Sequence, residues 1–360
     1  MKTKILLLGG TGAMGSHIVK LLTNTENEVY VTSRRHHESH DNIKYIIGNA
    51  HDIQFLNTLL TSESYDTIVD FMIYDTEEFK ERSLFLLNHC KQYIFISSSR
   101  VYSNNDELIT EETPRLLDVC KDTAYLSTDE YALTKARQEN LLKKSGRNNW
   151  TIVRPYITFS EYRLQLGVME KENWLYRALK GRTIVFSKDI AEKYTTLTYG
   201  HDVARGIISL FGQAEALGQV FHITVNESHK WEEILDWYVD VIKKETGIEP
   251  RVYMMEQNMR FHYHNTNLWQ VIVDRLYDRK FDTSKINKFI DTSTFVPTEK
   301  GLKESLKYFI VHPKFHYINW KDEAYYDKLT HEHASLTEME TLKQKIKYIL
   351  YRYFIPLSKF

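Results

Sequence analysis

Tyr131 and Lys135 are the residues whose types and spacing point most directly to chemistry. They stand four positions apart in a segment of helical period, residues 129–144, so the phenol and the ammonium share one helix face. A nearby ammonium favours the tyrosinate and lowers the pKa of the phenol from about 10, which makes it usable as a general acid or base near neutrality. This spacing also arises by chance in a chain with 24 tyrosines.

Three consecutive hydroxyls stand upstream of this pair. Ser97, Ser98 and Ser99 follow the apolar run at 93–96, which has the length of a strand. Hydroxyls at the carboxyl end of a parallel strand lie where such sheets bind ligands. The three serines are therefore candidates for a ligand-binding site.

A glycine-rich turn follows the first apolar run, residues 5–8. Gly9, Gly12 and Gly15 are spaced by three residues, and a helical apolar period comes next. Such glycines let the chain turn tightly, let backbone N–H groups approach a pyrophosphate and let the helix pack close to the sheet. A merely tight turn is the alternative to this dinucleotide site. The predicted cofactor contacts in the turn are Gly9, Gly12, Ala13, Met14 and Gly15.

The end of the second apolar run indicates which dinucleotide binds. An acidic residue at this point would bind the ribose 2′-hydroxyl of NAD. Here the run at 28–32 is followed by Ser33, Arg34 and Arg35, with no carboxylate. A guanidinium suits a 2′-phosphate, so NADP is favoured over NAD; the alternative is that both arginines are solvated loop charges.

A parallel sheet is needed to position these residues. Short apolar runs alternate with helical segments and predict an α/β fold with a Rossmann-like, doubly wound parallel sheet. We expect this NAD(P)-binding domain at 1–170, a smaller α+β substrate-binding lobe at 171–311 and a C-terminal helical tail at 312–360. Some strands and helices of the lobe could return to the first domain. The predicted strands are 5–8, 29–32, 45–47, 67–72, 93–96 and 151–153.

The order of these motifs resembles the extended short-chain dehydrogenase/reductases, the NAD(P)-dependent epimerase/dehydratase family. The resemblance covers about residues 1–311. It implies hydride chemistry at a carbinol or ketone of a nucleotide-activated sugar or related carbohydrate. In that chemistry Tyr131 exchanges the hydroxyl proton, Ser98 bonds the same oxygen and Lys135 binds the nicotinamide ribose. The motifs are the glycine turn, Ser-Ser-Ser-Arg-Val-Tyr at 97–102, Tyr131 with Lys135, Arg154-Pro155, His-Asp-Val-Ala-Arg-Gly at 201–206 and Phe-Asp-Thr-Ser-Lys at 281–285.

The resemblance also implies further contacts and favours some reactions over others. Asn49 and Pro155 would lie at the cofactor, and Ser99 and Arg251 at the substrate. A dehydratase of the family carries Asp-Glu directly after its catalytic hydroxyl, where this chain has Ser99 and Arg100. Epimerisation or simple reduction or oxidation is therefore expected, and dehydration is disfavoured. The alternative is a catalytically reduced Rossmann-fold protein that binds RNA or senses redox state.

Composition limits the partners of the chain. With 47 basic and 48 acidic residues the net charge is −1, which argues against nucleic-acid binding. Two cysteines, no signal-peptide pattern and no membrane span lead us to expect a cytoplasmic location. No metal site is predicted, because the histidines at 36–40 and 331–333 lie in polar segments and do not form the H-E-x-x-H zinc motif, and the pair at 262–264 is interpreted as packed or on the surface.

The tail ends in a basic and aromatic segment, residues 343–360, which predicts an amphipathic helix broken at Pro356. Such a helix would dock on the protein's own body, form an oligomer contact or lie on an anionic membrane, in that order of preference. A homodimer is an expectation from the family resemblance.

Overall fold

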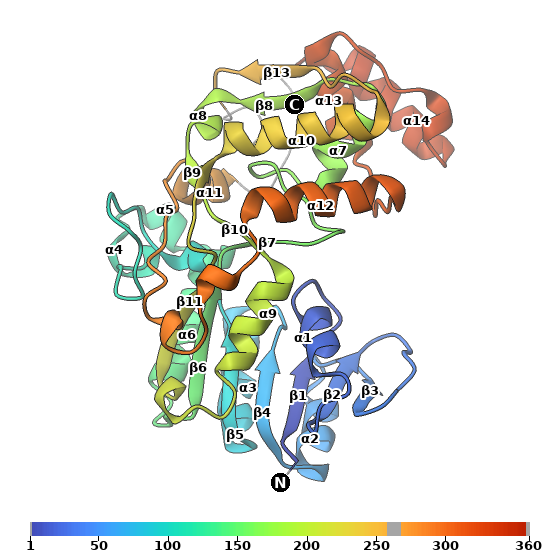
Figure 1. Cartoon of the computed structure of the whole chain (residues 1–360). Helices are drawn as coiled ribbons and strands as arrows, with labels where there is room; N and C mark the ends of the chain where they lie inside the picture. The colour runs from blue at the N-terminus through green and yellow to red at the C-terminus, as the bar shows by residue number, and fades with distance from the viewer. Residues whose placement is uncertain (1, 258–267, 358–360) are drawn as a thin grey trace. The chain divides into compact units, whose positions relative to one another are not determined.

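The predicted apolar strands form one sheet in the computed structural model, which describes residues 2–257 and 268–357 (Figure 1). Seven strands pair in the order β11-β6-β5-β4-β1-β2-β3, and all of these pairings are parallel. This order confirms the predicted Rossmann-like sheet, and it reverses beside β1, where doubly wound sheets bind ligands. The strands are β1 (Lys4–Leu8), β2 (Glu28–Ser33), β3 (Ile43–Ile47), β4 (Tyr65–Asp70), β5 (Cys90–Ile96), β6 (Trp150–Pro155) and β11 (Gln219–Ile223).

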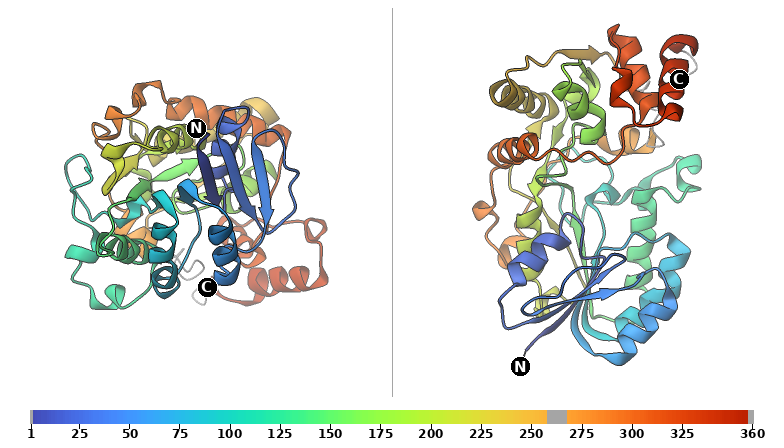
Figure 2. Two further views of the ribbon diagram at one scale, coloured as in Figure 1. Left: turned by 90° about the horizontal axis from the view of Figure 1, so that it is seen from below. Right: turned by 90° about the vertical axis from the view of Figure 1, so that its right-hand side faces the viewer.

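Helices cover both faces of this sheet (Figure 2). Side chains alternate along a strand, so Ile5 and Leu7 of β1 join one apolar core with α1 and α9. Leu6 and Leu8 join the opposite core with α2, α3 and α6. Burial on both faces explains why β1 is apolar throughout. The helices are α1 (Gly15–Leu22), α2 (Ile53–Ser62), α3 (Thr76–Asn88), α6 (Tyr131–Lys143) and α9 (Gly200–Ser209), with two short helices, α4 (Leu116–Val119) and α5 (Thr123–Leu126), before α6.

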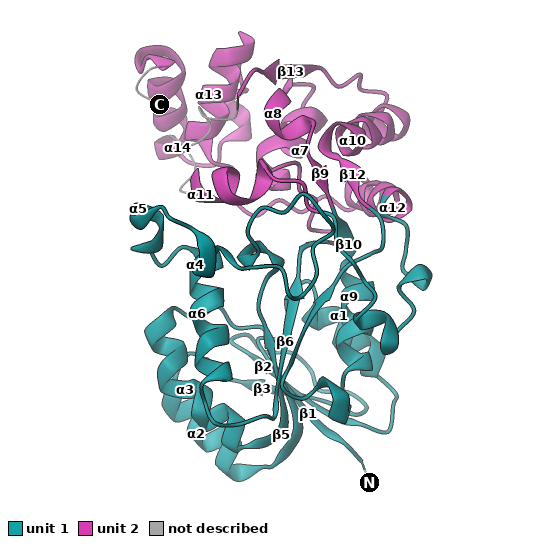
Figure 3. Cartoon of the chain, turned by 90° about the vertical axis from the view of Figure 1, so that its left-hand side faces the viewer, with its two compact units in different colours: residues 1–158, 196–227, 280–298 teal, residues 159–195, 228–279, 299–360 magenta. Residues whose placement is uncertain are grey.

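The chain divides into two compact units, each made of three segments (Figure 3). The first unit holds residues 1–158, 196–227 and 280–298, and therefore the whole seven-stranded sheet. The second holds 159–195, 228–279 and 299–360. The sequence analysis allowed for elements of 171–311 to return to the first domain, and the strand that contains Phe221 lies in the sheet as β11, paired with β6. The functional roles assigned to the ranges stay predictions.

The second unit is an α+β unit with a helical tail, as predicted. Two short strand pairs, β8 (Ile184–Ser187) with β13 (Val252–Met255) and β9 (Tyr194–Thr195) with β12 (His229–Lys230), lie in it. The rings of Trp174 and Tyr238 stack in its core at 4.5 Å. Its helices are α7 (Lys171–Leu179), α8 (Lys188–Ala191), α10 (Trp231–Thr246), α11 (Leu268–Gln270), α12 (Thr298–Val311), α13 (Trp320–Thr330) and α14 (Leu342–Ile349). The strands β7 (Ile157–Phe159) and β10 (Leu197–Tyr199) form a further pair.

The tail docks on the second unit through buried ion pairs. The guanidinium of Arg177 on α7 bonds Glu323 at 3.0 Å and Asp327 at 2.9 Å, both on α13. Arg182 bonds Glu338 at 3.0 Å. Such charges need their partners when buried, so these pairs fix α13 to the unit. The segment after it continues through α14 into a π-helical turn, Leu350–Phe354, which ends before Pro356.

Candidate active site

The glycine turn lies between β1 and α1 and is shaped by close backbone approach. Gly9 adopts φ +69°, a left-handed conformation that favours glycine, and its N–H donates to the Thr32 hydroxyl at 2.9 Å. A Cβ at Gly15 would lie 2.5 Å from the carbonyl oxygen of Gly10, so only glycine lets α1 start this close to the turn. A Cβ at Gly12 would meet nothing within 4 Å. Gly12 therefore faces open space at the point where a ligand would approach.

The start of α1 offers donors for an anion. Among residues 2–257 and 268–357, no partner accepts the N–H groups of Gly12, Ala13 or Met14. The first turn of α1 carries no acidic residue, and no side chain caps it. Unpaired N–H groups and the positive end of the helix dipole together favour a negative group such as a pyrophosphate. The predicted contacts of this turn thus fit a dinucleotide.

The predicted adenosine-ribose contacts lie at the ends of β2 and β3. Ser33 is the last residue of β2, and its hydroxyl accepts from the Arg35 N–H at 3.1 Å. The side chains of Arg34 and Arg35 are exposed and pair with no carboxylate in the part of the chain that the structure describes. Asn49 follows β3, and its side-chain oxygen accepts from the His51 N–H at 3.2 Å. Because β2 pairs in parallel with β1, and β3 pairs in parallel with β2, these residues share one sheet edge with the glycine turn.

The three serines after β5 have different partners. The Ser97 hydroxyl donates to Glu139 at 2.7 Å, and the Ser99 hydroxyl donates to the carbonyl oxygen of Arg154 at 2.8 Å. Both bonds are buried, so the Ser99 hydroxyl donates its proton inside the protein, and its substrate contact stays a prediction. The Ser98 hydroxyl accepts from the Arg100 N–H at 3.2 Å and donates to no group of the described residues. Of the three, Ser98 is the one with a proton to offer a ligand.

Tyr131 and Lys135 lie on the first turns of α6, as predicted. The Lys135 ammonium is buried and donates to the carbonyl oxygen of Ile96, the last residue of β5, at 2.9 Å. It lies 5.9 Å from the centre of the Tyr131 ring. Burial lowers the pKa of Lys135 to about 8, against the opposing pull of Asp70. The bond to Ile96 holds the ammonium beside the strand end that carries Ser98.

A second cation near Tyr131 is a feature that the sequence reasoning missed. The Arg100 guanidinium lies 5.3 Å from the centre of the Tyr131 ring and bonds Glu130 at 2.5 Å. Glu130 caps α6, and it accepts from the Ala132 N–H at 2.8 Å and from the Tyr125 hydroxyl at 3.1 Å. Glu130 thereby anchors Arg100 over the phenol. The signal in the sequence was the position of Arg100, two residues after Ser98.

A buried ion cluster around Glu139 supports residues 97–99, which we call the serine loop, through the bond from Ser97. Burial favours a raised pKa for Glu139, but Arg154 at 2.6 Å and Arg115 at 3.1 Å hold that pKa below its usual range. Pro155, a predicted cofactor contact, follows Arg154 as the last residue of β6 and is buried. This cluster fixes the carboxyl ends of β5 and β6.

Asp70 is a second buried carboxyl that the sequence reasoning did not single out. It ends β4, where it accepts from the Tyr93 hydroxyl at 2.7 Å and the Met72 N–H at 2.9 Å. Burial raises its pKa. It lies at the same sheet edge as the glycine turn, because β4 pairs with β1.

Arg251, predicted to contact substrate, lies in the second unit. Its guanidinium bonds Glu332 at 2.6 Å and the carbonyl oxygen of Gly181 at 2.9 Å. These partners belong to the tail region and to the turn after α7. In this arrangement the guanidinium ties two segments of the second unit together.

A family model described as the NAD dependent epimerase/dehydratase family matches residues 5–224. The chain belongs to this family. The match spans the glycine turn, the serine loop, α6 and β11. No curated protein matches the sequence.

Solved structures share the fold of this epimerase/dehydratase chain at low sequence identity. An epimerase from Methanothermobacter thermautotrophicus gives a TM-score of 0.67 at 15% identity, covering 86% of this chain and 93% of that one. The UDP-glucuronic acid 4-epimerase from Bacillus cereus, with UDP-glucuronic acid and NAD, gives 0.64 at 18%, covering 87% and 100%. The dTDP-glucose 4,6-dehydratase from Bacillus anthracis, with NAD, gives 0.63 at 16%, covering 86% and 97%.

The described residues of this epimerase/dehydratase chain hold no group of three His, Cys, Asp or Glu side chains that could bind a metal ion. His262 and His264 lie outside the described residues. No helix within the described ranges is long and apolar enough to cross a bilayer.

Proposed function

We propose that this chain is an NAD(P)-dependent oxidoreductase or epimerase acting on a nucleotide-activated sugar or related carbohydrate. The observation that supports the proposal is the buried Lys135 ammonium, which bonds Ile96 two residues before Ser98 and lies 5.9 Å from the centre of the Tyr131 ring. The N–H groups of Gly12, Ala13 and Met14 after β1 support a dinucleotide site at the same edge of the sheet, because no acceptor among the described residues pairs with them.

In this mechanism the side chains handle the proton and position the oxygen that carries it. During oxidation of a carbinol, Tyr131 accepts the hydroxyl proton as the C–O bond becomes a carbonyl, and it returns the proton when the carbonyl is reduced. Ser98 donates a hydrogen bond to the same oxygen and so limits the directions from which it reacts. When bound, the nicotinamide accepts or donates the hydride at the carbon.

Lys135 has two tasks in this mechanism. Its charge favours the tyrosinate, and its position on the β5 side of α6 suits a hydrogen bond to the nicotinamide ribose. Because burial brings its pKa to about 8, the ammonium is charged at neutrality but loses its proton in mildly alkaline solution.

Two observations refine the proposal. The exposed Arg34 and Arg35, without a carboxylate at the end of β2, favour NADP over NAD. Arg100 stands where a dehydratase of the family carries an acid, and its guanidinium lies over Tyr131. This favours epimerisation or simple reduction or oxidation over elimination of water. The nucleotide sugar itself is supported by similarity, since the Bacillus cereus structure contains UDP-glucuronic acid.

The test pairs a substrate screen with one conservative variant. Purified protein is incubated with UDP-, dTDP- and GDP-sugars and with NAD or NADP, and products are separated by chromatography. We expect turnover of at least one nucleotide sugar, and Tyr131→Phe should bind the dinucleotide normally while losing nearly all turnover. Undiminished activity of Tyr131→Phe would contradict the mechanism. Inactivity on every sugar together with salt-sensitive RNA binding would support a binding protein instead.

A further inference from the structure

The last helical segment of the tail, residues 342–357, leaves one apolar face uncovered. Leu342, Ile346, Leu350 and Phe354 are exposed by 72%, 58%, 45% and 72%. At about 100° per residue the first three fall within an arc of about 80°, so they form one stripe along α14. We call these four side chains the tail face. Large apolar side chains that gather on one exposed face, rather than scatter singly, mark an interaction site.

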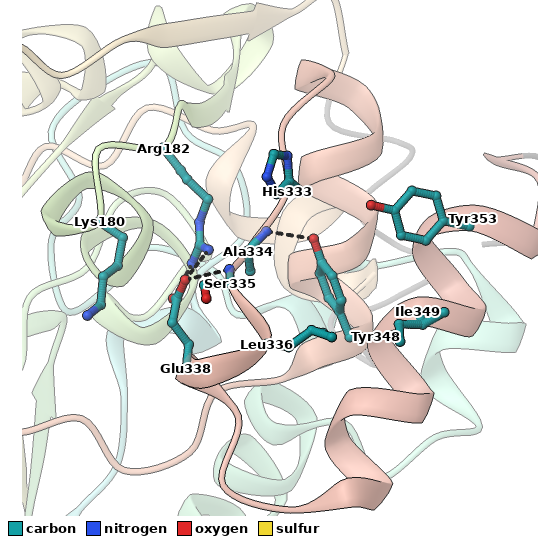
Figure 4. A pocket seen from close by; sticks show the side chains of 10 residues that line it. All are labelled: Lys180, Arg182, His333, Ala334, Ser335, Leu336, Glu338, Tyr348, Ile349 and Tyr353. Carbon is teal, nitrogen blue, oxygen red and sulfur yellow. Dashed lines mark hydrogen bonds and ion pairs between the residues drawn. The ribbon is translucent and has the colours of Figure 1, made fainter.

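The opposite side of the same segment is fixed to the second unit, which sets the direction of the tail face. Tyr348 is buried, and its hydroxyl donates to Asp327 at 2.6 Å. The same hydroxyl accepts from the Ala334 N–H at 2.7 Å (Figure 4). The Arg352 guanidinium donates to the carbonyl oxygen of Glu332 at 2.9 Å. These bonds hold the buried side against α13 and the loop that follows it. The tail face is therefore presented outward within this unit.

The charge beside the tail face has a single sign. Residues 342–357 contain three lysines and one arginine and no acidic residue, although the whole chain has a net charge of −1. Lys343, Lys345 and Lys347 form no ion pair with any carboxylate of the described residues. On a helical projection Lys343 and Lys347 flank one side of the stripe and Lys345 the other. The segment thus combines a long apolar stripe with cations on both sides.

We infer that the tail face lies on an anionic membrane surface. Apolar side chains enter the acyl boundary while flanking lysines meet anionic headgroups, which is how interfacial amphipathic helices bind. Tyr353, exposed next to Phe354, adds an amphipathic ring of the kind that favours the headgroup level. A second copy of this chain fits less well, because a two-fold contact would bring two sets of unpaired lysines together.

The experiment uses the full chain and vesicles of defined charge. Sedimentation compares phosphatidylcholine vesicles with vesicles that also contain phosphatidylglycerol, at low and high salt. We expect partitioning to the anionic vesicles only, weakened by salt. Replacing Lys343, Lys345 and Lys347 together by Gln should lower the partition coefficient about 100-fold. The double variant Ile346→Ser/Phe354→Ser should lower it at least about 10-fold.

Matched variants on the first unit provide the controls. Leu84→Ser with Leu108→Ser removes two apolar side chains that are exposed by 49% and 52%, and replacing Lys20, Lys121 and Lys144 by Gln removes three exposed lysines. Both should partition like the unaltered protein. Circular dichroism melting checks that each variant is folded. Equal sedimentation with neutral and anionic vesicles, or equal losses in the control variants, would overturn the inference. So would a dimer in analytical ultracentrifugation that the Ile346→Ser/Phe354→Ser change dissolves, because a second copy would then cover the tail face.

Discussion

The guanidinium of Arg100 lies 5.3 Å from the centre of the Tyr131 ring. The same guanidinium bonds Glu130, which caps α6, the helix that begins at Tyr131. With the Lys135 ammonium 5.9 Å from that centre, the ring has two cations beside it. Glu130 bonds the same guanidinium and offsets part of its charge. We propose that Arg100 is a positioning residue whose remaining charge, together with that of Lys135, favours the deprotonated phenol.

Replacing Arg100 by Met should shift the pH–rate profile for alcohol oxidation. We expect its acid-side midpoint to move up by about one to two pH units, with turnover at neutrality reduced about 10- to 100-fold. Because the change also leaves Glu130 without its cation, the variant is compared with Arg100→Met/Glu130→Gln. Arg100→Lys, which keeps a charge, should restore most of the profile. A midpoint that stays in place in Arg100→Met would rule out this role.

Alanine substitutions of Ser98 and Ser97 should have separate effects, the first on turnover and the second on the free energy of unfolding. Ser98→Ala should reduce kcat by about 10- to 100-fold and leave unfolding nearly unchanged, because its hydroxyl donates to no described group. Ser97→Ala should reduce the free energy of unfolding by about 1–3 kcal/mol, because it removes a buried bond to Glu139. Steady-state kinetics and urea unfolding measure the two effects. The reverse pattern would move the catalytic assignment to Ser97.

Lys135 should make stability depend on pH in a characteristic direction. Its folded pKa, about 8, lies below the ordinary value of 10.5, so between these values the unfolded chain binds more protons and stability rises with pH. Lys135→Met lacks this rise. The stability of the variant relative to the parent should therefore fall by about 2–3 kcal/mol from pH 7 to pH 10. Urea unfolding at both pH values tests this, and a constant difference would contradict it.

Turnover should also depend on the protonation of Lys135, but in the opposite direction: activity should fall as the pH rises, whereas stability rises. Since the mechanism needs the ammonium, the activity contributed by Lys135 should decline above about pH 8. The buried cation thus weakens the fold at neutrality while it supports catalysis there.

Gly12 and Gly15 of the turn should respond differently to alanine. Gly15→Ala forces a Cβ against the Gly10 carbonyl oxygen and should destabilise the fold by about 1–3 kcal/mol or more. Gly12→Ala has open space and should fold normally, but its methyl group should reduce dinucleotide affinity. Calorimetry of binding and of unfolding distinguishes them. Normal NADP affinity in Gly12→Ala would place the pyrophosphate elsewhere.

Arg34 and Arg35 should set the preference for the phosphorylated dinucleotide. Arg34→Gln/Arg35→Gln should weaken NADP binding about 10- to 100-fold or more and leave NAD nearly unaffected, because charge-assisted bonds contribute roughly 1.5–3 kcal/mol. Arg147→Gln, at another exposed arginine, serves as the control. Equal losses for the two dinucleotides would remove the case for NADP.

Local pattern was enough to predict the sheet and much of the candidate site. The strand-to-helix turn at Gly9–Gly15 and the Tyr131 and Lys135 spacing depend on neighbours in sequence, so periodicity and residue type sufficed. The contacts of Arg100 with Tyr131 and of Asp70 with Tyr93 join different elements, and no short-range pattern encodes them.

The same limit explains why the internal partners of Ser99 and Arg251 were not predicted. The Ser99 hydroxyl bonds the Arg154 carbonyl oxygen and the Arg251 guanidinium bonds Glu332, while the substrate contacts expected of both residues stay predictions. Such pairing depends on which segments the fold brings together. In the same way, the sequence allowed a strand of the lobe to return to the first domain, but nothing near Phe221 indicates that its strand would pair with β6.

The interleaving of the two units has a consequence for how the chain is made and cut. The polypeptide passes between them five times, so no single proteolytic cut can release either unit as a continuous fragment. During synthesis, one edge of β6 would lack a hydrogen-bonding partner until residues 219–223 leave the ribosome and pair with it as β11. We therefore expect nascent chains ending near residue 158 to need chaperones, and the sheet to close only after part of the second unit has been synthesised.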